Sequence, residues 1–543
     1  MNFKGIKNII SVAFVAVAAF MFTACSNDAN IFGGSLHPDN PNPKQETTVD
    51  YNNLLNKIYA NLALTGMTGP HGESDLPDDI DEGMSVFMRV VWYANELSSD
   101  EALCAWLTDA GIPEFNRGTW GDNHALLRGL YYRCMFGITL CNFVLDNAPS
   151  DLEDYSTKMA EVRFMRALYY YYLMDMYANP PFILHLSSEA APQATRSEIF
   201  AFVESEVKDV IGEGEGHQVL ASPKSVTYGR ADVAAGYMLL ARIYLNAQVY
   251  TGQARWADAR TYAEKAIKSG YALCTDGLNG YNAYQLLFMG DNDTNGAQNE
   301  IVFPVLFDGE LTQSWGGVFL CKGMANAADV AAYPMGIKDA WAGIRAKKYF
   351  VDKFFPNQDA PDGTPADLIE VAGDDRALFM TQEHEYEINT EGKFEEGYGY
   401  IKFINIHADG SEPHNSEHTD YDFPLFRLAE AYLTYAEADA RLNGGNCSGT
   451  ALNYIIALRE RAHANTDLNR FTLSDIEEEW SREFGFEGRR RMDMVRFGHF
   501  TGVQRIWING SAAGGTMSSY RNIFPLPASD LTANPNLTQN PGY

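Results

Sequence analysis

Residues 423–462 read FPLFRLAEAYLTYAEADARLNGGNCSGTALNYIIALRERA, and this stretch decides the fold. Apolar and small residues recur at helical spacing over 423–442 and again over 450–462. Between them, Asn443–Asn446 has the Gly and Asn content of a turn. The stretch therefore predicts two antiparallel helices, Phe423–Leu442 and Thr450–Ala462.

A second stretch repeats this plan nearer the N-terminus. Asp232–Leu245 has the pattern of an amphipathic helix, Gly252 interrupts the pattern, and Trp256–Lys268 resumes it with alanines where two helices would pack closely. Such a pair has roughly the 34-residue length of a tetratricopeptide repeat, and repeats of this kind bury their apolar faces by stacking. Two unrelated helical hairpins are the alternative.

The remaining chain contains further helices and one long irregular region. Helical periodicity marks 123–147 and 157–177, and prolines follow the second of these helices. Residues 271–420 are rich in Gly, Asn, Asp and aromatic residues, with one alternating strand pattern at 300–307. We expect a mostly α fold: a tetratricopeptide-like helical-repeat scaffold, with repeats at about 230–270 and 423–463, a loop-rich, irregular ligand-binding portion and a few short strands.

The first residues have the features of an export signal. Lys4 and Lys7 precede an apolar run, which ends at Phe22-Thr23-Ala24-Cys25. This order resembles a bacterial lipoprotein signal in which Cys25 is lipidated, although Phe22 stands where Leu is usual; an ordinary cleaved signal is the alternative. We predict a signal peptide over 1–24, a lipidated flexible tether over 25–48, and a single domain over 49–543.

Composition limits the classes of partner. The 543 residues carry 41 basic and 71 acidic side chains, a formal net charge of −30, which argues against nucleic-acid binding because that binding needs Lys and Arg on phosphates. Besides Cys25 there are six cysteines without the spacing of a disulfide framework or a zinc site, so buried free thiols are expected.

Motifs for catalysis or metal binding are weak. His414–His418 matches the HxxEH pattern of inverted zinc proteases, but the residues around it have no helical period, which predicts a polar loop. Asp291–Gly296 resembles the start of a calcium loop, yet Val302 occupies the position that needs Glu. We expect no cofactor, and leave open a single structural calcium.

Three stretches together resemble the SusD/RagB family of Bacteroidetes outer-membrane lipoproteins. They are DFPLFRLAEAYLTYAEA at 422–438, EFGFEGRRRMDMVRFG at 483–498, and the C-terminal FPLP at 524–527 with QNPGY at 539–543. Asn95–Glu101 and Asn299–Phe303 also fit the pattern of the family. We interpret the Arg and acidic residues of 487–496 as structural ion pairs.

The resemblance implies a non-catalytic protein at the exterior of the outer membrane. It implies capture of an oligosaccharide or polysaccharide and delivery to a SusC-like TonB-dependent transporter. A surface polysaccharide hydrolase and a peptide-binding member of the same fold are the alternatives.

Aromatic side chains in loops are the best candidates for glycan contact, because sugar rings present an apolar C–H face. Trp106 and Trp315 come first, and Gly316-Gly317 suggests room for a ligand beside Trp315. The predicted glycan-binding residues are Trp106, Trp315, Trp341, Trp92 and Tyr333, with Asp109 and Asn116 as polar contacts.

Overall fold

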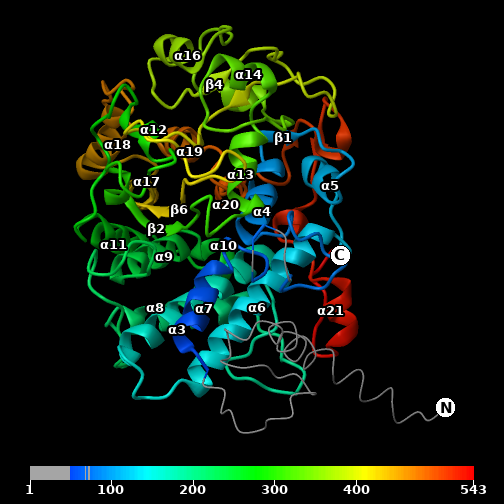
Figure 1. Ribbon diagram of the computed structural model, residues 1–543, viewed down its shortest axis with the longest axis vertical. Coiled ribbons are helices and arrows are strands. Elements are labelled where there is room, and N and C mark those ends of the chain that lie inside the picture. Colours follow the sequence, from blue (N-terminus) through cyan, green and yellow to red (C-terminus); the bar gives the residue numbers. More distant parts are fainter. Residues whose placement is uncertain (1–48, 68, 71–73) are drawn as a thin grey trace, which may run out of the picture. The chain divides into compact units, whose positions relative to one another are not determined.

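Both predicted helix pairs are present in a computed structural model of the chain, which describes residues 49–67, 69–70 and 74–543. The first pair is α9 (Val233–Leu245) and α11 (Trp256–Ile267), and the second is α17 (Leu428–Leu442) and α18 (Gly449–Arg461). α11 packs against both α9 and α17, so the two pairs stack as repeats (Figure 1). The predicted signal peptide, the tether and Cys25 lie outside the described residues.

Local chemistry sets the limits of these helices. The Asp232 carboxylate caps α9 by accepting from the amides of Ala234 and Ala235. Gly252, with φ of +76°, ends the short helix α10 (Ala247–Thr251), where the sequence predicted an interruption. Ala259 and Ala263 of α11 are fully buried, as close helix packing requires.

The chain forms two compact units. The first contains the described residues up to Phe87, with Gly121–Leu220 and Ile523–Tyr543; the second contains Met88–Trp120 and Ala221–Asn522. The single domain predicted for 49–543 stays a prediction. None of the described helices has the length and apolar character needed to cross a bilayer.

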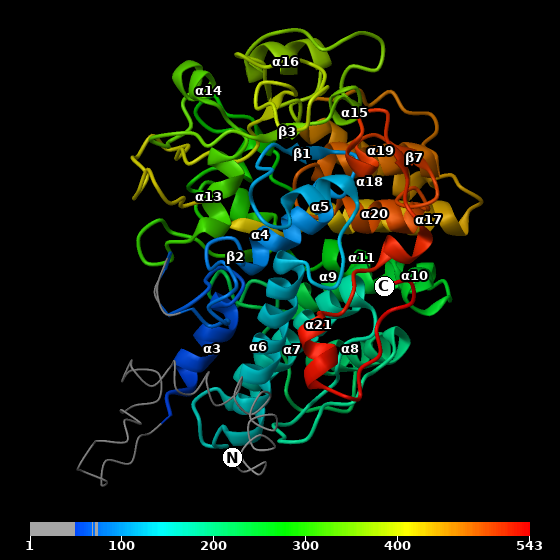
Figure 2. The ribbon, with the colours of Figure 1, turned by 90° about the vertical axis from the view of Figure 1, so that its right-hand side faces the viewer.

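The first unit is a helical layer closed by the C-terminal segment. Its helices are α3 (Tyr51–Ala60), α6 (Ala125–Asn147), α7 (Tyr155–Tyr177), α8 (Arg196–Val210) and α21 (Ala528–Ala533); α6 packs on α7, and α7 on α8 (Figure 2). Asn540 of the C-terminal QNPGY donates to the carbonyls of Tyr177 and Phe524 at 2.7 and 2.9 Å. These bonds attach the C-terminal motif to the end of α7, which gives the motif a structural role.

The second unit combines the repeats with short helices and strands. Its other helical elements are α4 (Phe87–Trp92, beginning at the last residue of the first unit), η2 (Tyr93–Leu97), α5 (Ile112–Arg117), α12 (Ala283–Leu286), η3 (Ala297–Asn299), α13 (Trp315–Lys322), α14 (Ala327–Ala332), α15 (Lys348–Val351), α16 (Pro365–Ala372), α19 (Leu473–Phe484), α20 (Arg490–Phe497), η4 (Ile508–Gly510) and η5 (Ser519–Asn522). The strands pair antiparallel, two by two: β1 (Ala102–Cys104) with β3 (Ile344–Ala346), β2 (Ile301–Val305) with β6 (Phe423–Arg427), β4 (Phe379–Met380) with β5 (Gly399–Tyr400), and β7 (Gln504–Arg505) with β8 (Gly515–Thr516).

One predicted boundary is wrong. The sequence predicted a helix from Phe423, but Phe423–Arg427 is strand β6, and the helix begins at Leu428. β6 pairs with β2, with Val305 opposite Phe423 and Ile301 opposite Arg427. Because every residue of β6 is buried, its apolar run has no alternation that would distinguish a strand from a buried helix.

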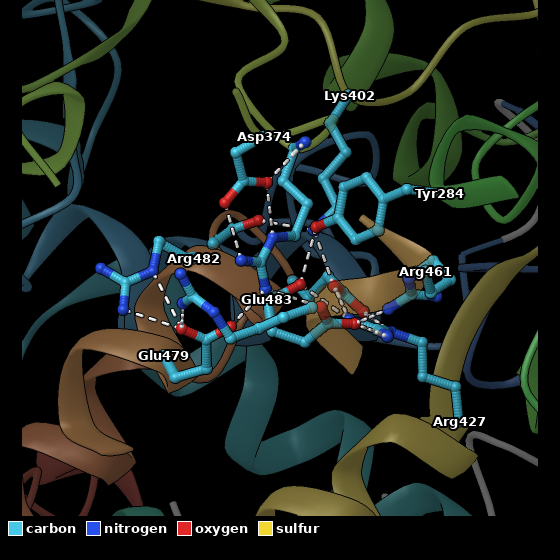
Figure 3. Close-up of polar contacts among 12 residues, drawn as sticks. Tyr284, Asp374, Lys402, Arg427, Arg461, Glu479, Arg482 and Glu483 are labelled. Carbon is cyan, nitrogen blue, oxygen red and sulfur yellow. Dashed lines mark hydrogen bonds and ion pairs between the residues drawn. The ribbon is translucent and has the colours of Figure 1, made fainter. Parts of the chain in front are cut away.

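A buried network of ion pairs connects elements that are distant in sequence (Figure 3). Arg427 of β6 contacts Glu483 of α19 at 2.6 Å and Glu300 at 3.2 Å, and Arg461 of α18 pairs with the same two carboxylates. None of these four side chains is exposed. Burial raises the pKa of Glu483, but the neighbouring arginines outweigh it and hold that pKa at about 2.

The Arg-rich signature at 487–496 is structural, as predicted. Arg489 pairs with Asp493 at 3.0 Å, and Arg496 pairs with Glu437 of α17 at 2.7 Å. The first pair lies within the start of α20, and the second attaches α20 to α17. The six cysteines in the described residues are free thiols, five buried and Cys447 partly buried.

Candidate functional site

Three half-buried tryptophans of the second unit form a row. The ring centroids of Trp106 and Trp341 are 6.3 Å apart, and those of Trp341 and Trp315 are 5.7 Å apart. Interplanar angles of 63° and 48° mean that each ring is tilted against the next. His418 extends it behind Trp315, at 4.8 Å. Three of the predicted residues, from segments more than 200 positions apart, are thus brought together.

A pocket of about 450 Å³ lies along one end of this row. Its lining residues are Arg89, Ala105, Trp106, Leu107, Thr108, Asp109, Trp341, Gly392 and Phe394. Most of the lining surface is apolar, with an arginine and a carboxylate at its edge. This combination suits a ligand with an apolar face and a hydroxyl rim.

Backbone geometry beneath Trp106 fixes the orientation of its ring. Gly343 has φ of +95°, and its carbonyl accepts from the amide of Ala105 at 2.8 Å. A Cβ added at Gly343 would lie 2.4 Å from Nε1 of Trp106. Only glycine therefore allows this close approach of strand β3 to the indole.

The main chain of Lys322, the last residue of α13, is hydrogen-bonded to the main chain at Trp341. Its carbonyl accepts from the amides of Trp341 and Ala342 at 2.8 and 3.2 Å. Its buried ammonium group pairs with Asp339, and with Glu417 at 2.8 Å. Because Trp315 begins the same helix, α13 fixes two of the three tryptophans.

Arg89 was missed by the sequence reasoning. Its guanidinium lies 6.0 Å from the ring centroid of Trp106 and 5.9 Å from that of Trp341, and its Nε donates to the Tyr93 hydroxyl at 2.7 Å. It therefore supports the row by cation–π contact and supplies a cationic group to the pocket. Local sequence contains no signal for this role, since Arg89 lies within an apolar helix.

Two of the predicted contact residues are buried. The Trp92 ring is 0% exposed, donates through Nε1 to the Phe486 carbonyl at 2.9 Å and packs against Phe319. Asn116 is 2% exposed, and its side chain donates to the Cys104 carbonyl and to the Glu391 carboxylate. Both residues serve the packing of the second unit, so neither is presented to a ligand in this structure.

The other two predicted residues differ in position. Asp109 lines the pocket close to Trp106. Tyr333, which follows α14, does not line it; its hydroxyl accepts from Gln285 at 3.3 Å. The glycines next to Trp315 are buried rather than open to a ligand, and a Cβ at Gly317 would meet Thr419 and Phe307.

Neither of the weak metal motifs forms a cluster. Throughout 49–67, 69–70 and 74–543, no group of three or more His, Cys, Asp or Glu side chains is arranged to hold a metal ion. In the calcium-like segment, the Asp291 carboxylate accepts from the Ala408 amide and the Asn295 side chain, so hydrogen bonds occupy it.

Comparison with known proteins identifies the family of the chain. A model of the SusD family matches residues 311–543, and one described as "starch-binding associating with outer membrane" matches 37–245. The starch-binding protein SusD of Bacteroides thetaiotaomicron is 36% identical, with both chains covered completely. This chain belongs to the SusD family.

Solved SusD-family structures share the fold. A SusD superfamily protein from Parabacteroides distasonis superposes with a TM-score of 0.66 at 23% identity, covering 90% of this chain and 98% of the other. Surface glycan-binding protein A from Bacteroides fluxus gives 0.64 at 20% identity, covering 90% and 98%. At these identities the likeness concerns the fold, and it confirms the mostly helical, repeat-based architecture.

Proposed function

We propose that this SusD-family protein binds a glycan along the row Trp106–Trp341–Trp315 and holds it without cleaving it. The observation that carries the proposal is the row itself, because three half-exposed indoles offer successive faces for the C–H surfaces of sugar rings. Arg89 and Asp109 supply a cation and a carboxylate for ring hydroxyls.

The first ligand class to test is an α-1,4-linked glucan. The full-length relative is named for starch binding, and its 36% identity covers the whole chain. A net charge of −30 does not repel such a neutral polymer. The protein would then capture oligosaccharides for a SusC-like TonB-dependent transporter, from an outer-membrane position that Cys25 anchors.

Calorimetric titration with maltoheptaose, and with unrelated glycans and peptides as comparison ligands, tests the proposal. We expect saturable binding of the glucan, and the Trp341→Ala variant should lose it. Binding of peptides but of no glycan would refute the proposal in favour of a peptide receptor. Reducing ends that increase with time on incubation with starch would refute the non-catalytic part.

A further inference from the structure

A loop on the wall of the pocket carries an aromatic residue that the tryptophan row does not include. Residues 389–397, named here the wall loop, contribute Gly392 and Phe394 to the pocket. The Phe394 side chain is 41% exposed, one of the few large apolar side chains in the described residues that reach this value. Because Trp106 and Trp341 line the same pocket, this exposed ring is available to a ligand that occupies it.

Phe394 lies next to Trp106. A Cβ added at Gly343 would be 3.1 Å from Cε1 of Phe394 and 2.8 Å from Cδ1 of Trp106, so the two rings flank the same glycine. Phe394 therefore adds a ring to the pocket beside Trp106, whereas Trp315 is not among the lining residues.

A buried arginine holds the wall loop from inside. Arg345 of β3 is 0% exposed and donates to the main-chain carbonyls of Glu391 at 2.7 Å, Glu396 at 2.9 Å, and Lys393. Its Nε also donates to the Gly343 carbonyl at 3.2 Å. One guanidinium thus connects the backbone under Trp106 to the backbone around Phe394.

Arg345 has an unusual electrostatic environment. No carboxylate lies within ion-pair distance of it in the described residues, so carbonyl groups make its direct contacts while the charges of Glu391, Glu395 and Glu396 act from farther away. Burial lowers its pKa to about 10. Burying an arginine in this way is costly, and three of its four hydrogen bonds go to one loop at the pocket.

Carboxylates fix the two ends of the same loop. Glu391 accepts from Asn116 and from Arg117 at 3.0 Å each. Glu396 accepts from the amide of Asn389 at 2.7 Å and from that of Thr390. The loop is therefore closed on itself and attached to α5, so Phe394 is presented on a defined backbone.

We propose that Phe394 is a further glycan contact, binding the sugar unit beyond Trp106, and that Arg345 is the positioning residue that presents it. This inference rests on the proposed function and adds a prediction that the tryptophan row alone does not make. Affinity should continue to rise with oligosaccharide length until a sugar unit reaches Phe394.

The test is calorimetric titration of malto-oligosaccharides of three to seven units into wild-type protein and Phe394→Ala. We expect the variant to lose little affinity for the shortest ligand and at least fivefold for the longest. The control is Tyr349→Ala, which removes another exposed ring (50%) outside the pocket. Equal losses at every length, or no loss, would overturn the inference while leaving the glycan site intact.

Arg345→Met tests the positioning role. We expect it to reproduce the length-dependent loss, with no additional loss in the double variant Arg345→Met/Phe394→Ala. Independent, additive losses would refute the role of Arg345, and the Phe394 variant alone still tests the contact if Arg345→Met fails to fold. If wild type binds a different glycan, the length series of that glycan is used; binding of no glycan would reject the proposed function itself.

Discussion

Removing one negative charge from the buried ion-pair network should reveal how much that charge contributes to the stability of the second unit. The perturbation is Glu483→Gln, which keeps the shape of the side chain but leaves Arg427 and Arg461 with one carboxylate fewer. Glu483 also contacts Arg376 at 3.1 Å, so three arginines lose a partner at once. Since an uncompensated buried charge is strongly destabilising, we expect a large loss.

The pKa of Glu483 gives the magnitude. Three arginines hold it at about 2 against an ordinary value of 4.5, after burial has acted in the opposite direction. At about 1.4 kcal/mol per pKa unit, this shift corresponds to about 3 kcal/mol of stability at neutral pH. A depressed pKa contributes fully above 4.5 and is lost as pH falls toward 2, so roughly half should remain at pH 3.

Guanidinium unfolding of wild type and variant at pH 7 and pH 3 measures both values. The expected difference in unfolding free energy is about 3 kcal/mol at pH 7 and between about 1 and 2 kcal/mol at pH 3. Glu460→Gln, at an exposed position near the end of α18, is the matched control and should change stability by less than about 0.5 kcal/mol. A difference below 1 kcal/mol at pH 7, or one that grows on acidification, would refute the reasoning.

Four further substitutions test the site and the first unit. Trp106→Ala and Trp315→Ala should each weaken glycan binding at least tenfold, about 1.4 kcal/mol, and unchanged calorimetric affinity in both would reject the row. Gly343→Ala should weaken binding similarly by displacing the Trp106 ring, which near-UV circular dichroism would report even without ligand; an unaltered spectrum and affinity would contradict the packing described. Burial raises the pKa of Asp530 to about 6, so the wild type loses stability as pH rises from about 3.8 to 6. Asp530→Asn removes the ionisable group, so it should raise Tm at pH 7 by relieving a destabilisation of up to about 3 kcal/mol. At pH 4 the same variant should melt close to wild type, and an equal shift at both pH values would exclude ionisation as its cause.

Helical periodicity was sufficient to predict most of the scaffold. The segments predicted at 123–147 and 157–177 are α6 and α7 within two residues at each end, because long amphipathic helices carry their signal locally. The error at Phe423–Arg427 has the opposite cause. That strand exists through pairing with β2, more than 100 residues earlier, and no local pattern reports such a partner.

The candidate site shows the same limit. Trp106, Trp315 and Trp341 could be selected as aromatic residues in loop-rich sequence, but so could Trp92, which is in the core. Exposure of an indole depends on what the rest of the chain places over it. The support that Arg345 gives the wall loop could not be predicted either, because its partners are carbonyl groups, which every residue has.

The ion-pair network also constrains how the second unit can form. Arg427 and Arg461 reach Glu300 across 127 and 161 positions of chain. Closing such long loops costs chain entropy, and this cost slows the formation of the contacts. These charged side chains are therefore expected to stay hydrated until late in folding. A chain interrupted before Glu483 would leave Arg427 and Arg461 with Glu300 but without their second carboxylate. The second unit is thus expected to complete its folding only when the C-terminal third of the chain is in place. After that, we expect it to unfold as a whole and to offer proteases few partly unfolded forms.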